Sequence, residues 1–196
     1  MLLNLVKFIF RGYFRTFYKV EIVGLDNIPL TGAVVLTCNH VSNFDPPLVG
    51  SFVGLKRDPI YVIKKELLKV PLVGRTLMSF GFIPVDRKRK GGDLHALKRA
   101  LKVIKDGKAL FIFPEGTRSK TGKPLKPKAG VGFLLWHCNC PVVPIKVFNT
   151  EKLPFTRNLK VVVGKPFTLE KEEGKEPKEQ FQDFADKVMQ EIIKLK

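Results

Sequence analysis

Residues 39–45 read NHVSNFD and place His40 and Asp45 five positions apart, with small polar residues between them. A loop of four residues can fold back so that the carboxylate reaches one imidazole nitrogen and leaves the other basic and exposed. Asp45 also precedes Pro46 and Pro47, and aspartate before proline is a common helix start. The segment therefore has two interpretations, a catalytic base with its carboxylate or a turn that ends in a helix cap.

The chain offers such a base no evident protein nucleophile. It lacks the GxSxG serine motif, and the context of its three cysteines, Cys38, Cys138 and Cys140, is not catalytic. Cys138 and Cys140 stand next to His137, but a second pair of metal ligands is missing, so we predict reduced thiols and no metal site. A histidine–aspartate base would then act on a hydroxyl brought by the substrate, or on water.

A second polar cluster, FPEGTRS (113–119), follows the apolar run ALFIF (109–113). Gly116 allows a tight turn, and an arginine beside backbone amides in such a turn suits a phosphate. Glu115 is expected to orient the arginine or a substrate hydroxyl. The alternative is an ordinary β-turn with a surface ion pair. On the first interpretation, the donors to the phosphate would be Thr117, Arg118 and Ser119.

A third cluster follows the run GFIPV (81–85), where Asp86 and Arg87 come directly after an expected strand. We expect Asp86 to hold Arg87 in place. Parallel strands end at one edge of a sheet, and ligands bind at that edge in open α/β sheets. Three strand ends would thus bring His40, Arg87 and Arg118 to one rim, which describes a site for a phosphorylated substrate with a free hydroxyl.

The elements that position these residues alternate along the chain. Short β-rich runs are separated by helical stretches, of which 91–107 has the clearest amphipathic pattern, and the segment 64–80 reads as helical pieces broken at Pro71. This alternation predicts one α/β domain over residues 20–196, with a largely parallel central sheet flanked by helices. The expected strands are 32–38, 59–63, 81–85, 109–113, 142–148 and 159–164.

Residues 1–19 form a separate amphipathic segment. Four cations spaced by four fall on one side of a helix, and apolar side chains cover most of the rest. This pattern predicts a helix at the membrane interface whose cations meet lipid phosphates; the alternative is a core helix with a solvated basic edge. A signal peptide is not indicated, and no apolar run is long enough to span a bilayer. The cations are Lys7, Arg11, Arg15 and Lys19.

The charge of the chain indicates a polyanionic partner. Its 35 lysines and arginines against 18 acidic residues give a formal charge of +17. Nucleic acid is not expected, because the chain shows no recognition helix, RNP-like block or zinc module. Charge alone does not decide between an anionic membrane surface and an acidic protein. The basic amphipathic segment 1–19 favours an anionic phospholipid surface, and we expect peripheral or monotopic attachment at the cytoplasmic face of the cell membrane. Basic runs at 88–90 and 123–128 lie in expected loops.

Together these segments resemble the conserved blocks of a known family. NHVSNFD resembles the NHxSxxD motif of the glycerolipid acyltransferases, the 1-acyl-sn-glycerol-3-phosphate acyltransferase family. GFIPVDR (81–87), FPEGTRS (113–119) and VVPI (142–145) resemble the second, third and fourth blocks, in the family's order. KKELLKVPLVG (64–74) resembles a segment between the first two blocks. The resemblance covers roughly residues 20 to 165, and Pro84 inside the second block limits strand pairing there.

The resemblance implies a role for each residue of the site. His40 would be the general base, and Asp45 would orient its imidazole. Arg87 and Arg118 would bind the substrate phosphate in a pocket shaped by the rest of the third block. The other residues implied at the substrate site are Asn39, Glu115, Gly116, Thr117, Ser119, Pro144 and Ile145, the last two lining an acyl or acceptor pocket. Asn39 and Ser42 would also support the catalytic pair.

The reaction implied is transfer of an acyl group from acyl-CoA or acyl-carrier protein to the sn-2 hydroxyl of lysophosphatidic acid, giving phosphatidic acid. The resemblance implies no metal and no cofactor beyond the acyl donor. Lys64, Lys65 and the basic run 88–90 are available for the phosphates of coenzyme A or for an acidic carrier protein. The sequence leaves two alternatives open: an acyltransferase for another lysophospholipid or lyso-lipid acceptor, and a non-catalytic lipid-binding protein of the membrane surface.

Overall fold

A seven-stranded sheet forms the centre of the computed structural model, which describes residues 2–88 and 92–196. The strand order is β1-β7-β6-β2-β5-β3-β4, and every neighbouring pair is parallel except β6 and β7. This confirms the predicted α/β domain with a largely parallel sheet. The strands are β1 (Lys19–Val23), β2 (Val34–Cys38), β3 (Ile60–Lys64), β4 (Ile83–Val85), β5 (Ala109–Ile112), β6 (Val142–Phe148) and β7 (Asn158–Val163).

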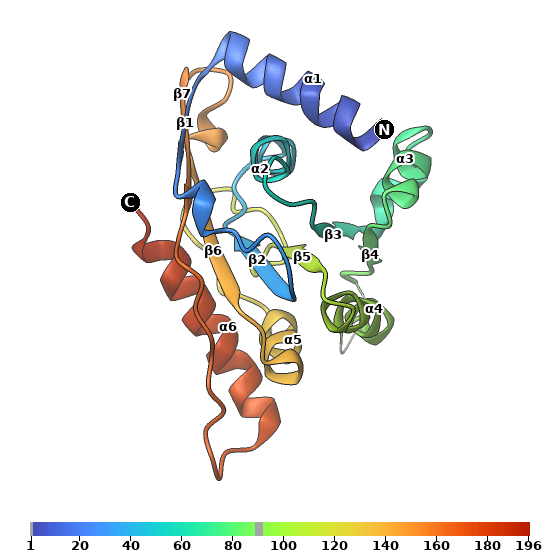
Figure 1. Ribbon diagram of the computed structural model, residues 1–196, viewed down its shortest axis with the longest axis vertical. Coiled ribbons are helices and arrows are strands. Elements are labelled where there is room, and N and C mark those ends of the chain that lie inside the picture. Colours follow the sequence, from blue (N-terminus) through green and yellow to red (C-terminus); the bar gives the residue numbers. More distant parts are fainter. Residues whose placement is uncertain (1, 89–91) are drawn as a thin grey trace.

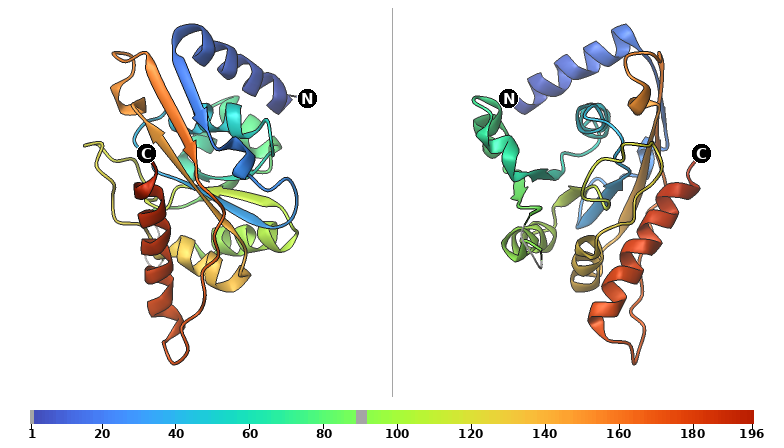
Figure 2. Two further views of the ribbon diagram at one scale, coloured as in Figure 1. Left: turned by 60° about the vertical axis from the view of Figure 1, so that its left-hand side comes forward. Right: turned by 180° about the vertical axis from the view of Figure 1, so that it is seen from behind.

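Helices cover both faces of this sheet (Figure 1). α1 (Leu2–Phe17) and α2 (Asp45–Val53) lie on one face, and α4 (Leu94–Lys105), α5 (Ala129–Cys138) and α6 (Pro177–Lys194) lie on the other, as the two further views in Figure 2 also show. The connection from β3 to β4 contains a 3₁₀ turn (Lys65–Lys69) and the short helix α3 (Val73–Ser79), as expected for helical pieces broken at Pro71.

The central strands are apolar on both faces because both faces are covered. In β2, Val34, Leu36 and Cys38 belong to the core under α1 and α2, whereas Val35 belongs to the core under α4, α5 and α6. All five residues of β2 are buried. A continuous apolar run is typical of a parallel strand between two helical layers. The strand therefore delivers the polar residues that follow it, beginning with Asn39, directly to the carboxyl edge of the sheet.

The predicted boundary of the N-terminal helix is wrong by two residues. α1 ends at Phe17, and Lys19, which was assigned to the helix, begins β1. The run KVEIV alternates exposed and half-buried residues and pairs with β7 at the edge of the sheet. Val20 and Ile22 pack against the core on the α1 side of the sheet. Lys19 thus continues the four-residue spacing of the cations only by coincidence, because it lies in a strand, where side chains alternate every two residues.

The orientation of α1 also differs from the prediction. Lys7 is buried and forms an ion pair with Asp58, and burial lowers the pKa of its amine, with Arg11 acting in the same direction. Arg11 Nε donates to the carbonyl oxygen of Ser51 at 3.1 Å. The expectation that these two cations meet lipid phosphates is therefore wrong, because the region of α2 supplies their partners. The exposed side of α1 is apolar and carries Leu2, Leu5, Phe8, Ile9, Tyr13 and Phe17.

Within the part of the chain that the structure describes, no helix combines the length and apolar character needed to cross a bilayer.

Candidate active site

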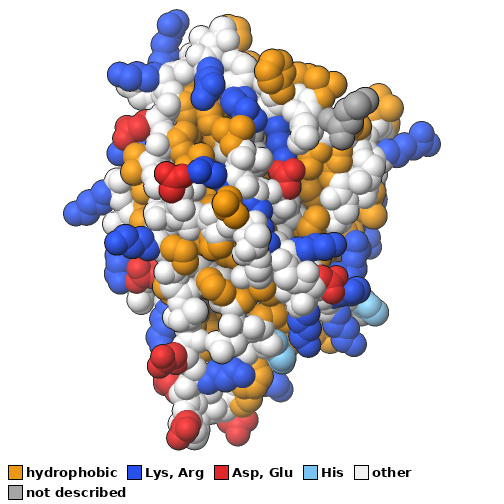
Figure 3. All heavy atoms as spheres, viewed as in Figure 1, with side chains coloured by type: hydrophobic (Ala, Val, Ile, Leu, Met, Phe, Trp, Pro, Cys, Tyr) orange, Lys and Arg blue, Asp and Glu red, His pale blue; other side chains and the backbone are white. Residues whose placement is uncertain are grey.

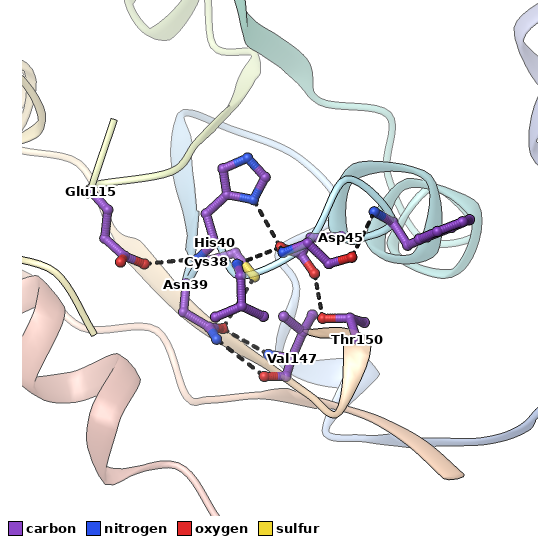
Figure 4. Close-up of polar contacts among 10 residues, drawn as sticks. Cys38, Asn39, His40, Asp45, Glu115, Val147 and Thr150 are labelled. Carbon is purple, nitrogen blue, oxygen red and sulfur yellow. Dashed lines mark hydrogen bonds and ion pairs between the residues drawn. The ribbon is translucent and has the colours of Figure 1, made fainter. Parts of the chain in front are cut away.

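His40 and Asp45 form a hydrogen-bonded pair at the carboxyl end of β2 (Figure 4). Nδ1 of His40 lies 2.8 Å from Oδ2 of Asp45. Both residues are buried, and Asp45 is completely inaccessible. Within residues 2–88 and 92–196, no hydrogen bond engages Nε2 of the imidazole. The loop of four residues thus folds back as the sequence suggested and leaves one ring nitrogen uncommitted.

The Asp45 carboxylate does not cap a helix. α2 begins at Asp45, but no side chain caps its amino terminus. Oδ2 of Asp45 instead accepts hydrogen bonds from the backbone N–H groups of Val41 and Ser42, each at 2.7 Å. Oδ1 accepts from Oγ1 of Thr150 at 2.5 Å. The prolines after Asp45 start the helix, and the carboxylate is directed back into the loop that carries His40.

The backbone of His40 is held on both sides by the segment 113–119. The N–H of His40 donates to Oε1 of Glu115 at 2.8 Å, and the N–H of Ser119 donates to the carbonyl oxygen of His40 at 2.8 Å. The ring of Phe113 stacks on the imidazole, with centroids 4.0 Å apart and planes 19° apart. β2 and β5 are neighbours in the sheet, so the segments after them meet. The third block thus fixes the histidine.

Glu115 has a different role from the one expected. Its Oε2 accepts from the N–H of Leu125 at 2.9 Å, so both carboxylate oxygens are bonded to backbone and the side chain is buried. Burial raises the pKa of Glu115, while the donated N–H groups of His40 and Leu125 oppose this shift. Its predicted function of orienting an arginine or a substrate hydroxyl is therefore wrong. Ser119 is also buried, and its N–H is committed to His40.

Asn39 is committed to the sheet rather than to a substrate. Its Oδ1 accepts from the N–H of Val147 at 2.8 Å, and its Nδ2 donates to the carbonyl oxygen of Val147 at 3.1 Å. The side-chain amide thereby continues the pairing of β2 with β6 past Cys38, the last paired residue of β2. We therefore correct its assignment from substrate binding to anchoring of the His40 loop.

The arginines lie on the exposed part of the same rim. Gly116 adopts a φ of 67°, which turns the chain so that Thr117 and Arg118 are exposed. Partial burial lowers the pKa of Arg87, and the positive charge of Arg118 acts in the same direction, whereas Glu66 opposes it. The two guanidinium groups are thus close enough to interact. Neither forms an ion pair within the described residues.

Asp86 does not hold Arg87 as predicted. Its carboxylate lies 3.6 Å from Nζ of Lys65, and its Oδ1 accepts from the N–H of Lys88 at 3.0 Å. Lys65 is thereby tied to the turn that follows β4. The remaining residues of the basic run, Arg89 and Lys90, lie outside the described residues.

A cavity of about 380 Å³ extends from the arginine end of the rim into the space between α4, α5 and the sheet. Arg87, Gly116 and Phe113 border it near the rim, and its deeper wall is apolar, formed by residues such as Ala100 and Leu134. Phe113 thus touches both the cavity and the imidazole of His40.

Pro144 and Ile145 do not line this cavity. Both are buried in β6, where they pair with Thr37 and Cys38 of β2. Ile145 is part of the core under α1 and α2. Their expected place in an acyl or acceptor pocket is therefore corrected to sheet packing. The strand does contribute to the site indirectly, because Val147 binds Asn39 and the following turn supplies Thr150.

Sequence reasoning missed two contacts of the catalytic pair. Phe113 was part of a recognised motif, but nothing in its spacing revealed that its ring stacks on His40. Thr150 stands outside every motif, in a 3₁₀ turn (Thr150–Lys152) that follows β6. The signal that could have identified Thr150 is its position just after β6, because β6 runs parallel to β2 and ends at the same edge of the sheet.

Comparisons with known proteins agree with this architecture. The family model described as Acyltransferase matches residues 19–147. A chloroplastic 1-acyl-sn-glycerol-3-phosphate acyltransferase of Brassica napus is 30% identical over 159 residues, which cover 76% of this chain and 45% of that protein. A 1-acyl-sn-glycerol-3-phosphate acyltransferase of Borreliella burgdorferi is 30% identical over 142 residues, covering 72% of this chain and 55% of that protein. The chain thus spans about half the length of these relatives.

The fold is also similar to a solved structure. The crystal structure of the 1-acyl-sn-glycerophosphate acyltransferase from Thermotoga maritima aligns with a TM-score of 0.73 at 24% identity. The alignment covers 96% of this chain and 77% of that one. The likeness includes the N-terminal region, since nearly the whole chain is aligned.

Proposed function

Because the chain belongs to the Acyltransferase family, we propose that it transfers an acyl group from a thioester to the sn-2 hydroxyl of 1-acyl-glycerol-3-phosphate, giving phosphatidic acid. The names of its relatives support this acceptor. The observation that carries the proposal is the buried His40–Asp45 pair, with Nε2 of the imidazole uncommitted, on the same rim as Arg87 and Arg118. Acyl-CoA and acyl-carrier protein are both candidate donors, and the mechanism uses no metal or further cofactor.

His40 acts as the general base in this mechanism. Its Nδ1–H donates to the carboxylate of Asp45, so the lone pair is on Nε2. The negative charge of Asp45 stabilises the imidazolium that forms when Nε2 takes a proton. A positioned base of this kind contributes about 10²- to 10⁴-fold to a rate. The hydrogen bond that the N–H of His40 donates to Glu115 and the one that its carbonyl oxygen accepts from Ser119 fix the backbone of His40, so the base is in place before the substrate binds.

The transfer proceeds without an acyl-enzyme. Nε2 of His40 removes the proton from the substrate hydroxyl as its oxygen attacks the thioester carbonyl carbon, and the carbonyl electron pair moves to the carbonyl oxygen. The tetrahedral intermediate then collapses, the carbon–sulfur bond breaks, and the imidazolium returns the proton to the departing thiolate. The products are an ester and a free thiol, and His40 is neutral again. This scheme needs no nucleophilic side chain.

Arg87, Arg118 and Thr117 bind the acceptor phosphate. The first two carry positive charge on the exposed rim. Neither forms an ion pair within the described residues, and Glu66 acts on Arg87 only through the longer-range attraction of its charge. Guanidinium groups bind phosphate oxygens in a bidentate manner, which orients the bound molecule as well as attracting it. A phosphate held there would place the neighbouring glycerol hydroxyl towards His40.

The cavity beside Arg87 is the candidate site for an acyl chain. A charged mouth and an apolar interior match an amphiphile, whose chain gains about 0.8 kcal/mol per buried methylene. Small residues on the facing helices, Ala100 of α4 and Gly130 of α5, keep its interior open. A larger side chain at Ala100 is expected to shift the activity towards shorter chains.

The exposed apolar sides of α1 and α3 form the candidate membrane face. Phe8 is 69% exposed on α1, and Leu72, at the start of α3, is 78% exposed with a positive φ of 62°. α3 lies near the amino-terminal end of α1 (Figure 1), and hydrophobic side chains and cations share the surface there (Figure 3). Apolar groups of this kind enter the headgroup region, and each nearby cation adds about 1 kcal/mol on anionic lipid.

A pair of matched variants tests this face. Phe8→Asp should weaken sedimentation with phosphatidylglycerol-containing vesicles, because it places a carboxylate in the apolar surface. Thr16→Asp adds the same charge at an exposed polar position of α1 and should bind vesicles more nearly as the unchanged protein does. Equal binding by both variants, at the level of the unchanged protein, would remove α1 from the membrane face.

A panel of donors and acceptors tests the proposed function. The purified protein is given radiolabelled acyl-CoA or acyl-carrier protein, with lysophosphatidate, lysophosphatidylglycerol or lysophosphatidylcholine in mixed micelles. We expect labelled phosphatidate to form fastest, because a phosphomonoester offers the two arginines its full charge. Faster acylation of a phosphodiester acceptor would change the acceptor assignment. Vesicle binding without transfer to any acceptor would favour a lipid-binding protein.

A further inference from the structure

Thr150 contacts the proposed catalytic pair from outside all recognised motifs. Its Oγ1 lies 2.5 Å from Oδ1 of Asp45, and both side chains are buried, at 1% and 0% exposure (Figure 4). We infer that Thr150 is a positioning residue for the acyl transfer: its hydroxyl fixes the Asp45 carboxylate, which in turn orients His40. This inference rests on the proposed function.

The topology of the sheet explains how the two residues meet. Thr150 is 105 positions beyond Asp45 and lies outside residues 19–147, which the family model covers. β2 and β6 are parallel neighbours, with Cys38 opposite Ile145. The loop after β2 and the turn after β6 therefore leave the same edge of the sheet side by side. Asn39 binds Val147 across this boundary and fixes the register of the two segments.

The two carboxylate oxygens of Asp45 differ in how they are held. Oδ2 has three partners, all in the loop 40–42: Nδ1 of His40 and the N–H groups of Val41 and Ser42. Oδ1 has one hydrogen-bond partner within the described residues, the hydroxyl of Thr150. Without that hydroxyl, a buried anionic oxygen would lose its donor, which is costly, and the carboxylate would gain freedom to rotate.

The hydroxyl also affects the charge that His40 experiences. A hydrogen bond donated to a carboxylate stabilises its negative charge and draws it towards the donor. Removing the donor at Oδ1 leaves more of the charge at Oδ2, which faces Nδ1 of His40. Both this redistribution and any rotation of the carboxylate change how Asp45 interacts with the imidazole. The acid limb of the pH–rate profile should therefore shift in a variant that lacks the hydroxyl.

Among the described residues, Glu115 and Cys38 are titratable groups that act electrostatically on the pair, and neither forms a hydrogen bond with Thr150. Glu115 binds the N–H groups of His40 and Leu125 from the segment after β5. Cys38 precedes the loop, and its Sγ donates to Oδ1 of Asn39. Burial raises the pKa of the Cys38 thiol well above its ordinary value, so this group stays neutral. A shifted acid limb in a Thr150 variant would thus report on the His40–Asp45 pair.

Three variants, used in two matched comparisons, separate the contribution of the hydroxyl from that of packing. Thr150→Val keeps the shape of the side chain and removes the hydroxyl. Thr150→Ser keeps the hydroxyl and removes a methyl group, and Thr150→Ala differs from it by the hydroxyl alone. If the valine variant does not fold, the serine and alanine variants still give the comparison. Thermal unfolding of each protein measures the packing contribution separately.

The kinetic readout is acyl transfer to lysophosphatidate over a range of pH. Because a hydrogen bond to a charged group is involved, we expect Thr150→Val to lower kcat roughly 10- to 100-fold. KM for lysophosphatidate should stay within about threefold, since the arginines are untouched. Thr150→Ser should recover most of kcat and the acid limb of the unchanged protein. Equal loss in the serine and alanine variants, or an unshifted acid limb in Thr150→Val, would reduce Thr150 to a packing role.

A second readout does not depend on activity. The imidazole Nδ1–H that donates to Asp45 should give a downfield proton resonance, identified by its absence in His40→Ala. We expect Thr150→Val to shift or broaden this resonance and Thr150→Ser to retain it. An unchanged resonance in Thr150→Val would overturn the inference. If the unchanged protein showed no acyl transfer, the proposed function would fail, while this resonance would still decide whether Thr150 holds Asp45.

Discussion

Two regions of one sheet edge are built in opposite ways. The catalytic corner, which consists of His40, Asp45, Glu115 and Thr150, is buried, and each carboxylate oxygen in it has a hydrogen-bond partner. The arginine rim, which consists of Arg87, Thr117 and Arg118, is exposed, and its guanidinium groups have no ion pair within the described residues. The two regions are adjacent because Glu115 and Arg118 belong to one short segment.

The difference follows from what each region must do. A base that accepts a proton in the transition state works best when its orientation is fixed before the reaction. A phosphate site must instead bind and release a charged molecule, and internal carboxylates would compete with that molecule for the arginines. The contrast teaches that the same motif, FPEGTRS, contributes rigidity through Glu115 and Ser119 and free charge through Arg118.

Among the three variants that test this contrast between the regions, the largest effect is expected from Asp45→Asn. An amide offers one acceptor oxygen, so it cannot satisfy the donors around both carboxylate oxygens, and it cannot stabilise the imidazolium by charge. We expect kcat to fall roughly 10²- to 10⁴-fold while KM changes little. Asp26→Asn, at an aspartate whose side chain is 91% exposed, is the matched control. If kcat for Asp45→Asn stays close to that of the control, the catalytic corner does not depend on this carboxylate.

An intermediate effect is expected from Glu115→Gln. Glutamine provides one acceptor oxygen, so the N–H of either His40 or Leu125 loses its partner, at about 1–3 kcal/mol. For a protein of this size, that lowers the melting temperature by several degrees. We expect kcat to fall together with the melting temperature and KM for lysophosphatidate to stay unchanged. The matched variant Glu170→Gln, at an exposed position, should alter neither kcat nor the melting temperature. A raised KM with an unchanged melting temperature would instead indicate that Glu115 contacts the substrate.

The smallest catalytic effect is expected from Arg118→Ala. Loss of one charged contact to phosphate should raise KM for lysophosphatidate about tenfold, corresponding to about 1.4 kcal/mol, with kcat and the melting temperature nearly unchanged. Lys120→Ala removes an exposed cation two residues further on and serves as the control for general charge. A large fall in kcat at unchanged KM would place Arg118 with the catalytic corner and erase the contrast between the two regions.

The sequence could predict those parts of the site that depend on local spacing. His40 and Asp45 are joined by a four-residue loop, so their contact followed from chain geometry, and the alternation of elements predicted the parallel sheet. Contacts between segments far apart in the chain could not be predicted in this way. Glu115, Asn39 and Thr150 find their partners through the order of the strands, which the sequence pattern leaves open.

The N-terminal helix illustrates a second limit. Periodicity identified two sides of α1 but not which of them packs against the protein. Lys7 and Arg11 face inward because Asp58 and the carbonyl group of Ser51 lie within reach of their long side chains. The apolar side, which would ordinarily be expected to pack inside, is left exposed. Charge pattern alone would have assigned the opposite orientation.

The central claim is that His40 removes the proton from the acceptor hydroxyl, and His40→Ala tests it most directly. The measurement is the rate of phosphatidate formation from acyl thioester and lysophosphatidate, with circular dichroism and vesicle sedimentation as controls for folding and membrane binding. We predict a fall of roughly 10²-fold or more with both controls unchanged. A variant that keeps its rate within about tenfold of the unchanged protein would contradict the assignment of His40 as the base.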